Sequence, residues 1–316
     1  MLRYFPVSPA TNRGQRPRLY VHGAGEAPQC AMDLRRGKLW PLLLLLTAEC
    51  VKPIPTDESY LLDGKPSLAA EFPWHVGIYL HENDGYLQLC SGTLIKRKLV
   101  LTAAHCLGKS NNPKDYMIVA GKYHRGWDIK DPKEQQLEVE SIVIHDMYRG
   151  PSRNYADDIA IIVLKNEIRI SDFVRPASLD LESKYEREQL SSGSFGSIAH
   201  WDYNESPEPS DELLMTKLPF IEFSQCYEQL PQSVRPLFAS DKFCAGFRNG
   251  TALCAGDGGG GLLFEQKVTA TTKQWFIQGI VSLGPSRGVK PCSSYPVLFT
   301  RVNSHLNWLK IYYDKY

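Results

Sequence analysis

The strongest constraint on the fold of this chain is a series of short apolar segments between residues 72 and 302. Each segment has the length and the content of β-branched and aromatic residues of a β-strand, and Gly, Pro, Asn and Asp cluster between segments as turn residues do. The expected strands are Val76–Leu80, Cys90–Ile95, Leu99–Thr102, Tyr116–Ala120, Leu137–Ile144, Ile159–Leu164, Ser194–Trp201, Gln274–Leu283 and Leu298–Val302. So many short strands predict an all-β barrel or sandwich.

The last segment of the chain has helical periodicity instead. Asn303 is a residue type that caps helices. Apolar residues then recur at the spacing of one helix face, at Val302, Leu306, Leu309 and Tyr313. We therefore expect a C-terminal α-helix after the last strand. No unit of about 20–50 residues repeats along the chain, which argues against a propeller or a solenoid.

Length and charge exclude several functional classes. A length of 316 residues fits one large domain or two modest ones. Lys and Arg number 36 against 35 Asp and Glu, so the chain lacks the basic excess that a nucleic-acid partner requires. No apolar run approaches the roughly 18 residues that a membrane-spanning helix needs, so we expect no membrane span.

The amino-terminal region differs from the rest of the chain. Residues 1–31 are rich in Arg, Pro and Gly, and we expect a disordered segment upstream of the true start at Met32. Residues 32–48 combine a basic stretch, an apolar run of about ten residues and a small residue, which are the parts of a secretory signal peptide. The alternative is a buried strand or short helix, but the basic flank favours export. The mature chain is then expected to begin near Glu49.

Three short motifs contain residue types that carry chemistry. Val100–Cys106 ends a strand with one His beside one Cys, Asp158–Leu164 begins a buried strand with an Asp, and Cys254–Gly261 is a glycine-rich loop with one acid. Each motif is weak alone, because a single His is more often structural than catalytic and a glycine-rich loop is usually a turn.

In this order the three motifs resemble those of the chymotrypsin-type serine proteases. Further segments that match are Glu71–Trp74, Cys90–Ile95, Val174–Pro176, Gly279–Ser282 and Thr300–Val302, followed by Trp308. The resemblance covers about residues 61–316, after a short propeptide-like segment at 49–60. It implies two six-stranded antiparallel β-barrels packed face to face, with a C-terminal α-helix and an active site in the cleft between the barrels.

The resemblance also implies a role for each site residue. His105 occupies the general-base position, and Asp158, rather than its neighbour Asp157, occupies the position that orients this base. The backbone N–H groups of Gly256 and Gly258 correspond to the oxyanion hole.

Gly258 stands where the family has its nucleophilic serine. Glycine has no side-chain atom that could attack a carbonyl, and loss of the nucleophile lowers turnover by roughly 2 × 10⁶ in a Ser-His-Asp enzyme. We therefore predict a non-catalytic homologue, of a type found in arthropod proteolytic cascades, in which His105 and Asp158 are relics or packing groups. The alternatives are an active serine endopeptidase of unusual mechanism and a ligand-binding module.

The expected activation site departs from the family pattern as well. Active members are cut after Arg or Lys, whereas Tyr60 precedes Leu61 here. Asp257 corresponds to the acid that pairs with the new amino terminus in active members. We therefore expect no tryptic activation and no cationic partner of this kind for Asp257.

The specificity pocket implied by the resemblance is altered too. Ala252 stands at its floor, where an acid would be needed to hold Arg or Lys. Leu283 and Gly284 form the wall, and Val297 replaces a wall glycine. These residues imply a narrow, apolar pocket.

The cysteines indicate the compartment. The pairs implied by the resemblance are Cys90–Cys106, Cys226–Cys244 and Cys254–Cys292. Disulfides of this kind form in an oxidising compartment, so we expect a secreted, extracellular protein. Zinc binding is the rival use of cysteine, but the chain has no Cys-x-x-Cys or paired His spacing, so we expect no metal and no cofactor.

Cys50 has no partner in this scheme. Ser178 stands where related chains with a tethered propeptide have the matching cysteine. Cys50 is then free, links two chains or pairs with Cys30, and the sequence leaves these three states open.

Two acceptor sequences predict glycosylation. Asn249 begins Asn-Gly-Thr, and Asn204 begins Asn-Glu-Ser, which Pro207 weakens. The expected partners are extracellular proteins, among them active serine proteases.

Overall fold

The structure is a computed structural model. It describes residues 70–83, 85–201, 210–247, 258–284 and 295–316, together with the backbone of residues 30–32, 48–50 and 65–66. The chain divides into two units, Met1–Glu58 and Ser59–Tyr316.

In the first unit, two short strands pair. β1 (Cys30–Met32) runs antiparallel to β2 (Ala48–Cys50), and the register places the backbone of Cys30 opposite that of Cys50. The other residues of the expected disordered segment, signal peptide and propeptide-like segment lie outside the described residues, so these assignments stay predictions.

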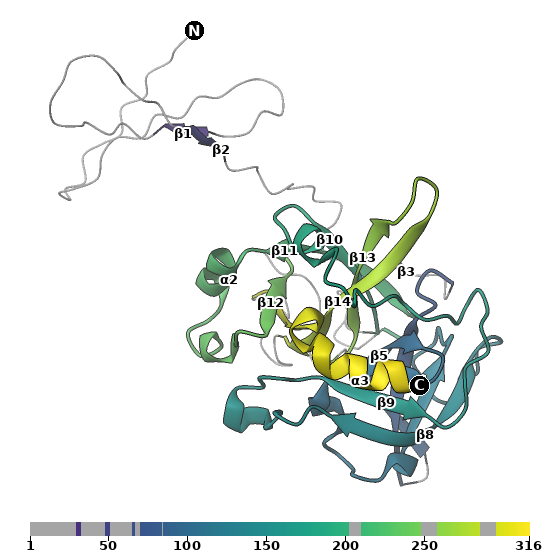
Figure 1. The fold of residues 1–316 in the computed structure, drawn as a ribbon. Coiled ribbons are helices and arrows are strands. Elements are labelled where there is room, and N and C mark those ends of the chain that lie inside the picture. The colour runs from purple at the N-terminus through teal and green to yellow at the C-terminus, as the bar shows by residue number, and fades with distance from the viewer. Residues whose placement is uncertain are drawn as a thin grey trace, which may run out of the picture. The chain divides into compact units, whose positions relative to one another are not determined.

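The first β-barrel of the second unit closes in the order β4-β5-β6-β9-β8-β7. Its strands β5, β8 and β9 are labelled in Figure 1. Its strands are β4 (His75–Glu82), β5 (Gly85–Lys96), β6 (Leu99–Thr102), β7 (Tyr116–Ala120), β8 (Gln135–Ile144) and β9 (Ala160–Leu164). β9 is apolar and buried along its whole length. β8 alternates instead, because Leu137 and Val139 are buried while Glu138 and Glu140 are exposed. One face of β8 therefore lines the barrel interior and the other faces solvent.

The second β-barrel has the ring order β10-β13-β14-β15-β12-β11, and pairing of β10 with β11 closes it. Its strands are β10 (Phe195–His200), β11 (Leu214–Ile221), β12 (Lys242–Ala245), β13 (Gly261–Lys267), β14 (Lys273–Leu283) and β15 (Val297–Arg301). A further strand, β3 (Lys65–Pro66), pairs with β11 outside this ring. Two closed six-stranded antiparallel barrels within the described ranges confirm the predicted fold class.

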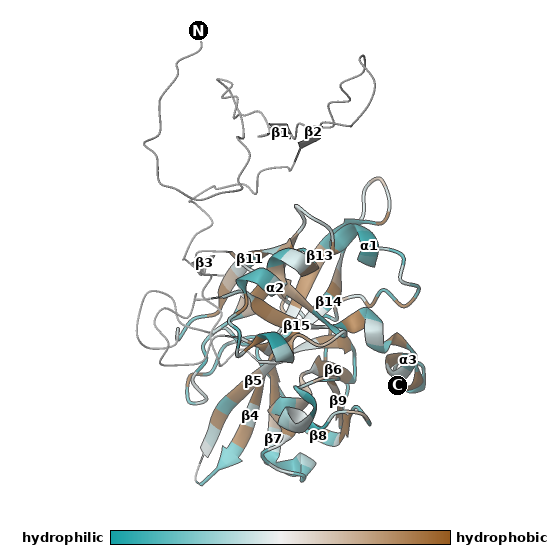
Figure 2. Cartoon of the chain, turned by 90° about the vertical axis from the view of Figure 1, so that its left-hand side faces the viewer, coloured by the Kyte–Doolittle hydropathy of each residue, from teal (hydrophilic) through white to brown (hydrophobic). Residues whose placement is uncertain are grey.

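Helices are short and lie outside the barrels. They are α1 (Glu186–Gln189), α2 (Phe223–Gln229) and α3 (Leu306–Lys315), with 3₁₀ segments η2 (Ala104–Leu107), η3 (Pro113–Asp115), η4 (Gly150–Arg153), η5 (Arg235–Leu237) and η6 (Val302–His305). Leu306 and Leu309 of α3 are buried in the same apolar cluster as the first barrel. Figure 2 shows hydrophobic residues along the strands and hydrophilic residues in α1. No helix in the described part of the chain is long and apolar enough to cross a membrane.

Two details of the predicted secondary structure were wrong. The sequence pattern missed β11, β12 and β13, because β11 contains Lys217 and Pro219, β12 is very short, and β13 follows a glycine run. Asn303 does not cap α3, which begins three residues later. Its side chain accepts a hydrogen bond from Ser183 and donates one to Glu186, so its amide serves a tertiary contact instead of the helix end.

Candidate active-site region

His105 and Asp158 are brought together by the pairing of two neighbouring strands. β6 and β9 run antiparallel, so the end of β6 lies beside the start of β9. His105 follows β6 in η2, and Asp158 lies just before β9. The Cys90–Cys106 disulfide ties η2 to β5 and restricts the turn that carries the imidazole. Local pairing therefore builds the dyad that the sequence predicted.

The carboxylate of Asp158 accepts three hydrogen bonds. The ring Nδ1–H of His105 donates to Oδ2 over 2.8 Å, and the backbone N–H of His105 donates to Oδ1 over 2.9 Å. The hydroxyl of Ser282 donates to Oδ2 over 2.6 Å. Because an ionised carboxylate can only accept, Nδ1 carries a proton in this arrangement, and Nε2 is the ring nitrogen directed away from Asp158, as in a Ser-His-Asp site.

The electrostatics of the dyad favour an ionised Asp158. The side chain is fully buried, and burial alone would raise its pKa. The charge of His105 and the hydrogen bonds from His105 and Ser282 outweigh that penalty, so the pKa of Asp158 lies below its ordinary value. The buried charge is thus compensated within the fold.

The ring of His105 lies where a serine side chain would begin. A Cβ atom added to Gly258 would meet His105 Nε2 at 2.5 Å and Cε1 at 3.1 Å, and real Cβ atoms essentially never make contacts under 3.0 Å. His105 Nε2 is also 3.6 Å from the sulfur of Cys106. With the ring in this position, residue 258 has room for glycine alone.

The backbone beside Gly258 is held by both barrels. The N–H of Ser91 donates to the carbonyl of Gly258 over 2.9 Å, and the N–H of Gly259 donates to the carbonyl of Val281 over 2.9 Å. Gly259 has a φ of +81°, and a Cβ there would strike the side chain of Thr102 and the carbonyl of Ser91. The glycine at 259 is therefore required by backbone conformation and by close approach.

Comparison with known families agrees with this geometry. The sequence profile of the trypsin family matches residues 61–309, most of the chain. The chain belongs to the trypsin family.

Several trypsin-family proteins of arthropods are similar to the chain. Clotting factor C of Tachypleus tridentatus is 30% identical over 260 residues, which cover 79% of this chain and 25% of that protein. Phenoloxidase-activating factor 3 of Holotrichia diomphalia is 30% identical over 269 residues, covering 80% and 72%, and melanization protease 1 of Drosophila melanogaster is 30% identical over 269 residues, covering 79% and 64%. The matched part is thus only a quarter of the clotting factor.

Three of the residues predicted for the specificity pocket lie in the described part of this trypsin-family chain. Leu283 ends β14 and Gly284 follows it, while Val297 begins β15. Val297 is buried against apolar residues of the second barrel, and Leu283 packs on a smaller cluster that includes Leu298. Ala252, the expected floor, lies outside the described residues, so the shape of the pocket stays a prediction.

Two of the predicted disulfides are present. Cys90 bonds to Cys106, and Cys226 of α2 bonds to Cys244 of β12. The other predicted site residues lie outside the described ranges: Gly256 and Asp257, Cys254 and Cys292, and the glycosylation acceptors Asn204 and Asn249.

Ser282 is a site residue whose role the sequence pattern did not assign. It holds Asp158, and Thr300 on the next strand donates to the backbone carbonyl of Asp158 over 3.0 Å. Lys242 Nζ in turn donates to Thr300 over 3.1 Å. The family motif around Gly279–Ser282 was the one available signal for Ser282. Thr300 lies in the matching segment Thr300–Val302, which does not indicate its contact with Asp158. Lys242 gave no signal, because its contact depends on strand neighbours far apart in sequence.

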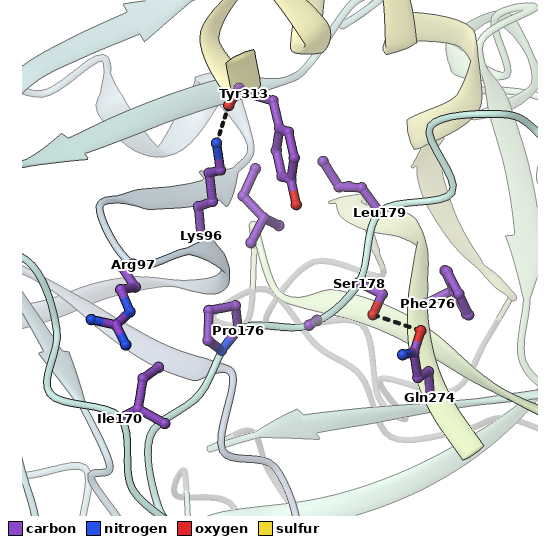
Figure 3. Close-up of a pocket in the computed structure, with 11 residues that line it drawn as sticks. Lys96, Arg97, Ile170, Pro176, Ser178, Leu179, Gln274, Phe276 and Tyr313 are labelled. Atoms are coloured by element: carbon purple, nitrogen blue, oxygen red, sulfur yellow. Dashed lines mark hydrogen bonds between the residues drawn. The ribbon is translucent and has the colours of Figure 1, made fainter. Parts of the chain in front are cut away.

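Ser178 lines a surface hollow of about 510 Å³ (Figure 3), and neither residue of the dyad belongs to this lining. Its lining includes Lys96, Pro176, Gln274 and Tyr313. The Ser178 hydroxyl donates to the amide oxygen of Gln274 over 3.5 Å, and the Lys96 ammonium donates to the carbonyl of Tyr313. Position 178 is thus a polar surface site. The sequence resemblance implies a cysteine at this position in relatives with a tethered propeptide.

Proposed function

We propose that the mature chain is a secreted, non-catalytic trypsin-family protein that binds or regulates active extracellular proteases. The observation that carries this proposal is residue 258. Glycine supplies no nucleophile there, and the ring of His105 lies within 2.5 Å of the position that a Cβ atom would need. A Ser-His-Asp mechanism requires an Oγ atom at that place.

The retained parts of the site support a role for the folded cleft. Asp158 keeps all three of its donors, and the backbone at Gly258 keeps its bond to Ser91. These contacts hold the two barrels together at the site, although the site lacks a nucleophile. The similar proteins named above include a clotting factor and a phenoloxidase-activating factor, and a protein with an intact but unreactive cleft suits regulation of such proteases.

The regulatory role is tested with purified components. The secreted chain is titrated into a purified active trypsin-family protease, and two quantities are measured: affinity by biolayer interferometry and the rate at which that protease cleaves its protein substrate. We expect saturable binding and a changed cleavage rate. The matched control is a reduced and alkylated sample, which has lost the fold. Equal rates with and without the native chain, and no binding, would contradict the regulatory role.

Export is a separate part of the proposal. The Cys90–Cys106 and Cys226–Cys244 bridges support an oxidising compartment. Expression in eukaryotic cells should release the chain into the medium with an amino terminus near Glu49. A secreted form that retains Tyr20 would overturn the start at Met32.

The covalent state of the secreted chain gives further tests. Asn249→Gln should remove a glycosidase-sensitive mass shift, with a smaller effect for Asn204→Gln. Non-reducing electrophoresis of the Cys50→Ser variant decides whether Cys50 links two chains.

Trypsin treatment should release no new amino terminus at Leu61, because Tyr60 precedes it.

An active endopeptidase of unusual mechanism is the competing function. It predicts hydrolysis by the purified chain that requires His105. The non-catalytic proposal predicts no hydrolysis and no labelling by fluorophosphonate reagents, which phosphonylate activated serines.

A further inference from the structure

A second polar cluster lies behind the dyad, beside Asp158. His145 follows β8, Asp157 immediately precedes Asp158, and His305 ends η6. One ligand-type atom from each of the three side chains lies within 4.8 Å of the others. The rings of His145 and His305 are 5.0 Å apart and nearly perpendicular. Two imidazoles and one carboxylate thus converge from three separate segments.

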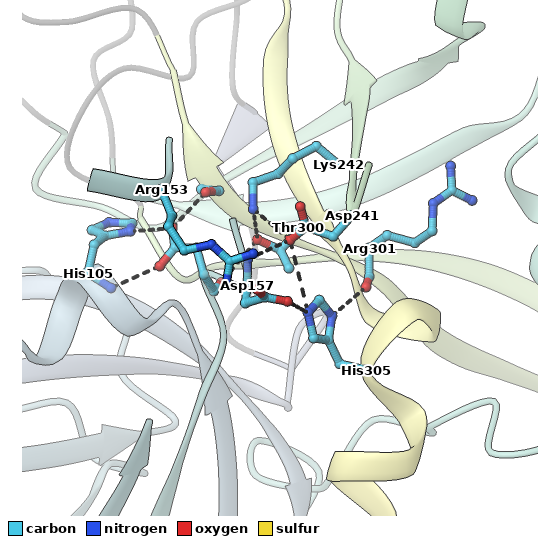
Figure 4. Close-up of polar contacts among 10 residues, drawn as sticks. His105, Arg153, Asp157, Asp241, Lys242, Thr300, Arg301 and His305 are labelled. Atoms are coloured by element: carbon cyan, nitrogen blue, oxygen red, sulfur yellow. Dashed lines mark hydrogen bonds and ion pairs between the residues drawn. The ribbon is translucent and has the colours of Figure 1, made fainter. Parts of the chain in front are cut away.

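The hydrogen bonds of His305 leave one ring nitrogen directed at an acid (Figure 4). Its Nδ1 lies 3.1 Å from the backbone carbonyl of Arg301, which can only accept, so Nδ1 carries a proton. Its Nε2 lies 3.1 Å from Oδ1 of Asp157, which is also an acceptor. Both atoms can act as ligands, so the pair is placed to share a cation.

A metal ion is such a cation. A ligating histidine usually donates its other ring N–H to a carbonyl or carboxylate, and the Nδ1–Arg301 bond is an interaction of this kind. Asp157 is likewise oriented, because its backbone N–H donates to Asp241 over 2.9 Å. The cluster therefore has the ligands and also the groups that orient them.

Unpartnered polar atoms border the cluster. Oδ1 of Asp241 and Nε1 of Trp308 are buried and find no hydrogen-bond partner within the described residues. Asp241 Oδ2 is 4.0 Å from His305 Nε2, and the Trp308 ring is 5.1 Å from that of His145. An ion with a bound water would supply both a donor and an acceptor to such groups.

We propose that His145, Asp157 and His305 form a zinc site. Zinc favours two imidazoles, a carboxylate and a fourth position left to water. Asp157 is 22% exposed and gives the ion a route from solvent, while His305 is only 3% exposed. The contact from Met147 N–H to His145 Nδ1 is long, at 3.3 Å, and is readily exchanged for a stronger metal bond. An ion here would fasten the first barrel to the segment that begins α3.

Local charges are compatible with this ion. Asp157 and Asp241 contribute two carboxylates, Lys242 is bound to Asp241 at 3.0 Å, and Arg153 is 4.0 Å from the far oxygen of Asp157. Lys242 therefore neutralises Asp241, while the exposed Arg153 can swing into solvent. The carboxylate of Asp157 remains for the metal.

The test uses the full secreted chain after treatment with a chelator and its removal. Zinc chloride is titrated by calorimetry, and Tm is measured at rising zinc concentrations. We expect about one zinc per chain and a Tm that rises with free zinc, because the folded state alone presents the three ligands. Cobalt should bind at the same place and give the visible absorption of a tetrahedral site.

Variants decide where the ion binds. His145→Gln should weaken zinc binding at least about tenfold. His305→Gln should do the same, and because His305 is buried, the half-exposed His145 serves as the decisive position if that variant fails to fold. The matched control is His124→Gln, since His124 pairs with Asp131 elsewhere in the first barrel. No zinc binding by the native chain, or equal binding by the native and His145→Gln proteins, would overturn the proposal.

Discussion

The Nε2 atom of His105 lies 2.5 Å from the position that a Cβ atom on residue 258 would occupy. The ring is held there by the hydrogen bond from Nδ1 to Asp158, so it cannot withdraw without loss of this buried contact. Replacement of the nucleophile by Gly258 and the placement of the imidazole are therefore linked. The dyad has the connectivity of a general base and no space for the group that it would activate.

Gly258→Ser alone should not restore protease activity. The new Cβ would press on His105, and we expect a loss of about 1–3 kcal/mol in the free energy of unfolding, as in other overpacked sites. Activity is measured as hydrolysis of a mixed reporter-peptide set and as fluorophosphonate labelling. Gly108→Ser is the matched control, because a Cβ there has only one neighbour, at 3.9 Å. Full activity in the Gly258→Ser protein would show that the altered activation site and pocket are harmless.

Asp158→Asn should destabilise the fold, although the proposed non-catalytic function assigns Asp158 no chemistry. The variant keeps one acceptor but turns an amide toward donors from His105 and Ser282. We expect a loss of about 2–4 kcal/mol in the free energy of unfolding, measured by urea titration, because buried donors lose their partner. Asp172→Asn is the control, since Asp172 is an exposed member of a surface ion pair. Equal stabilities of the two variants would show that the dyad does not contribute to packing.

Two buried histidines should make the fold sensitive to acid. The pKa of His75 and that of His200 are both lowered to about 3, mainly by burial, and the proximity of His200 contributes to the value of His75. The unfolded chain takes up protons below about pH 6.5 while the folded chain does not, so the free energy of unfolding falls as pH decreases. The decrease is at most about 1.4 kcal/mol per pH unit for each histidine.

Urea titrations at pH 7 and pH 5 measure this effect. The double variant His75→Gln/His200→Gln should show a flatter dependence in this window. Asp158 also has a lowered pKa, and it contributes stability that is lost only at more acid pH, below the ordinary range of an unfolded carboxyl. An unchanged slope in the double variant would refute the assignment to these histidines.

The strand pattern predicted an all-β fold, and the resemblance of short motifs to those of the chymotrypsin-type proteases implied the two barrels and the dyad. The apolar run of β9 and the small residues after β6 place His105 and Asp158 at the paired ends of two strands. The pattern failed for β11, whose polar face and Pro219 hide the strand, and for Asn303, whose side chain binds Ser183.

Sequence patterns could not predict the contacts between residues that are far apart in the chain. The three residues of the proposed zinc site come from positions 145, 157 and 305, so no metal-binding spacing exists to be recognised. The close approach of His105 to residue 258 depends likewise on how the two barrels pack. Such relationships are set by tertiary structure and carry no period or motif.

Hydrolysis of reporter peptides by the purified secreted chain tests the non-catalytic assignment most directly. The native protein is compared with its His105→Ala variant, prepared in the same way, so that a contaminating protease contributes equally to both. The account predicts the same background rate for the two proteins, because Gly258 offers no nucleophile for His105 to activate. Hydrolysis by the native protein that disappears in the His105→Ala variant would contradict it.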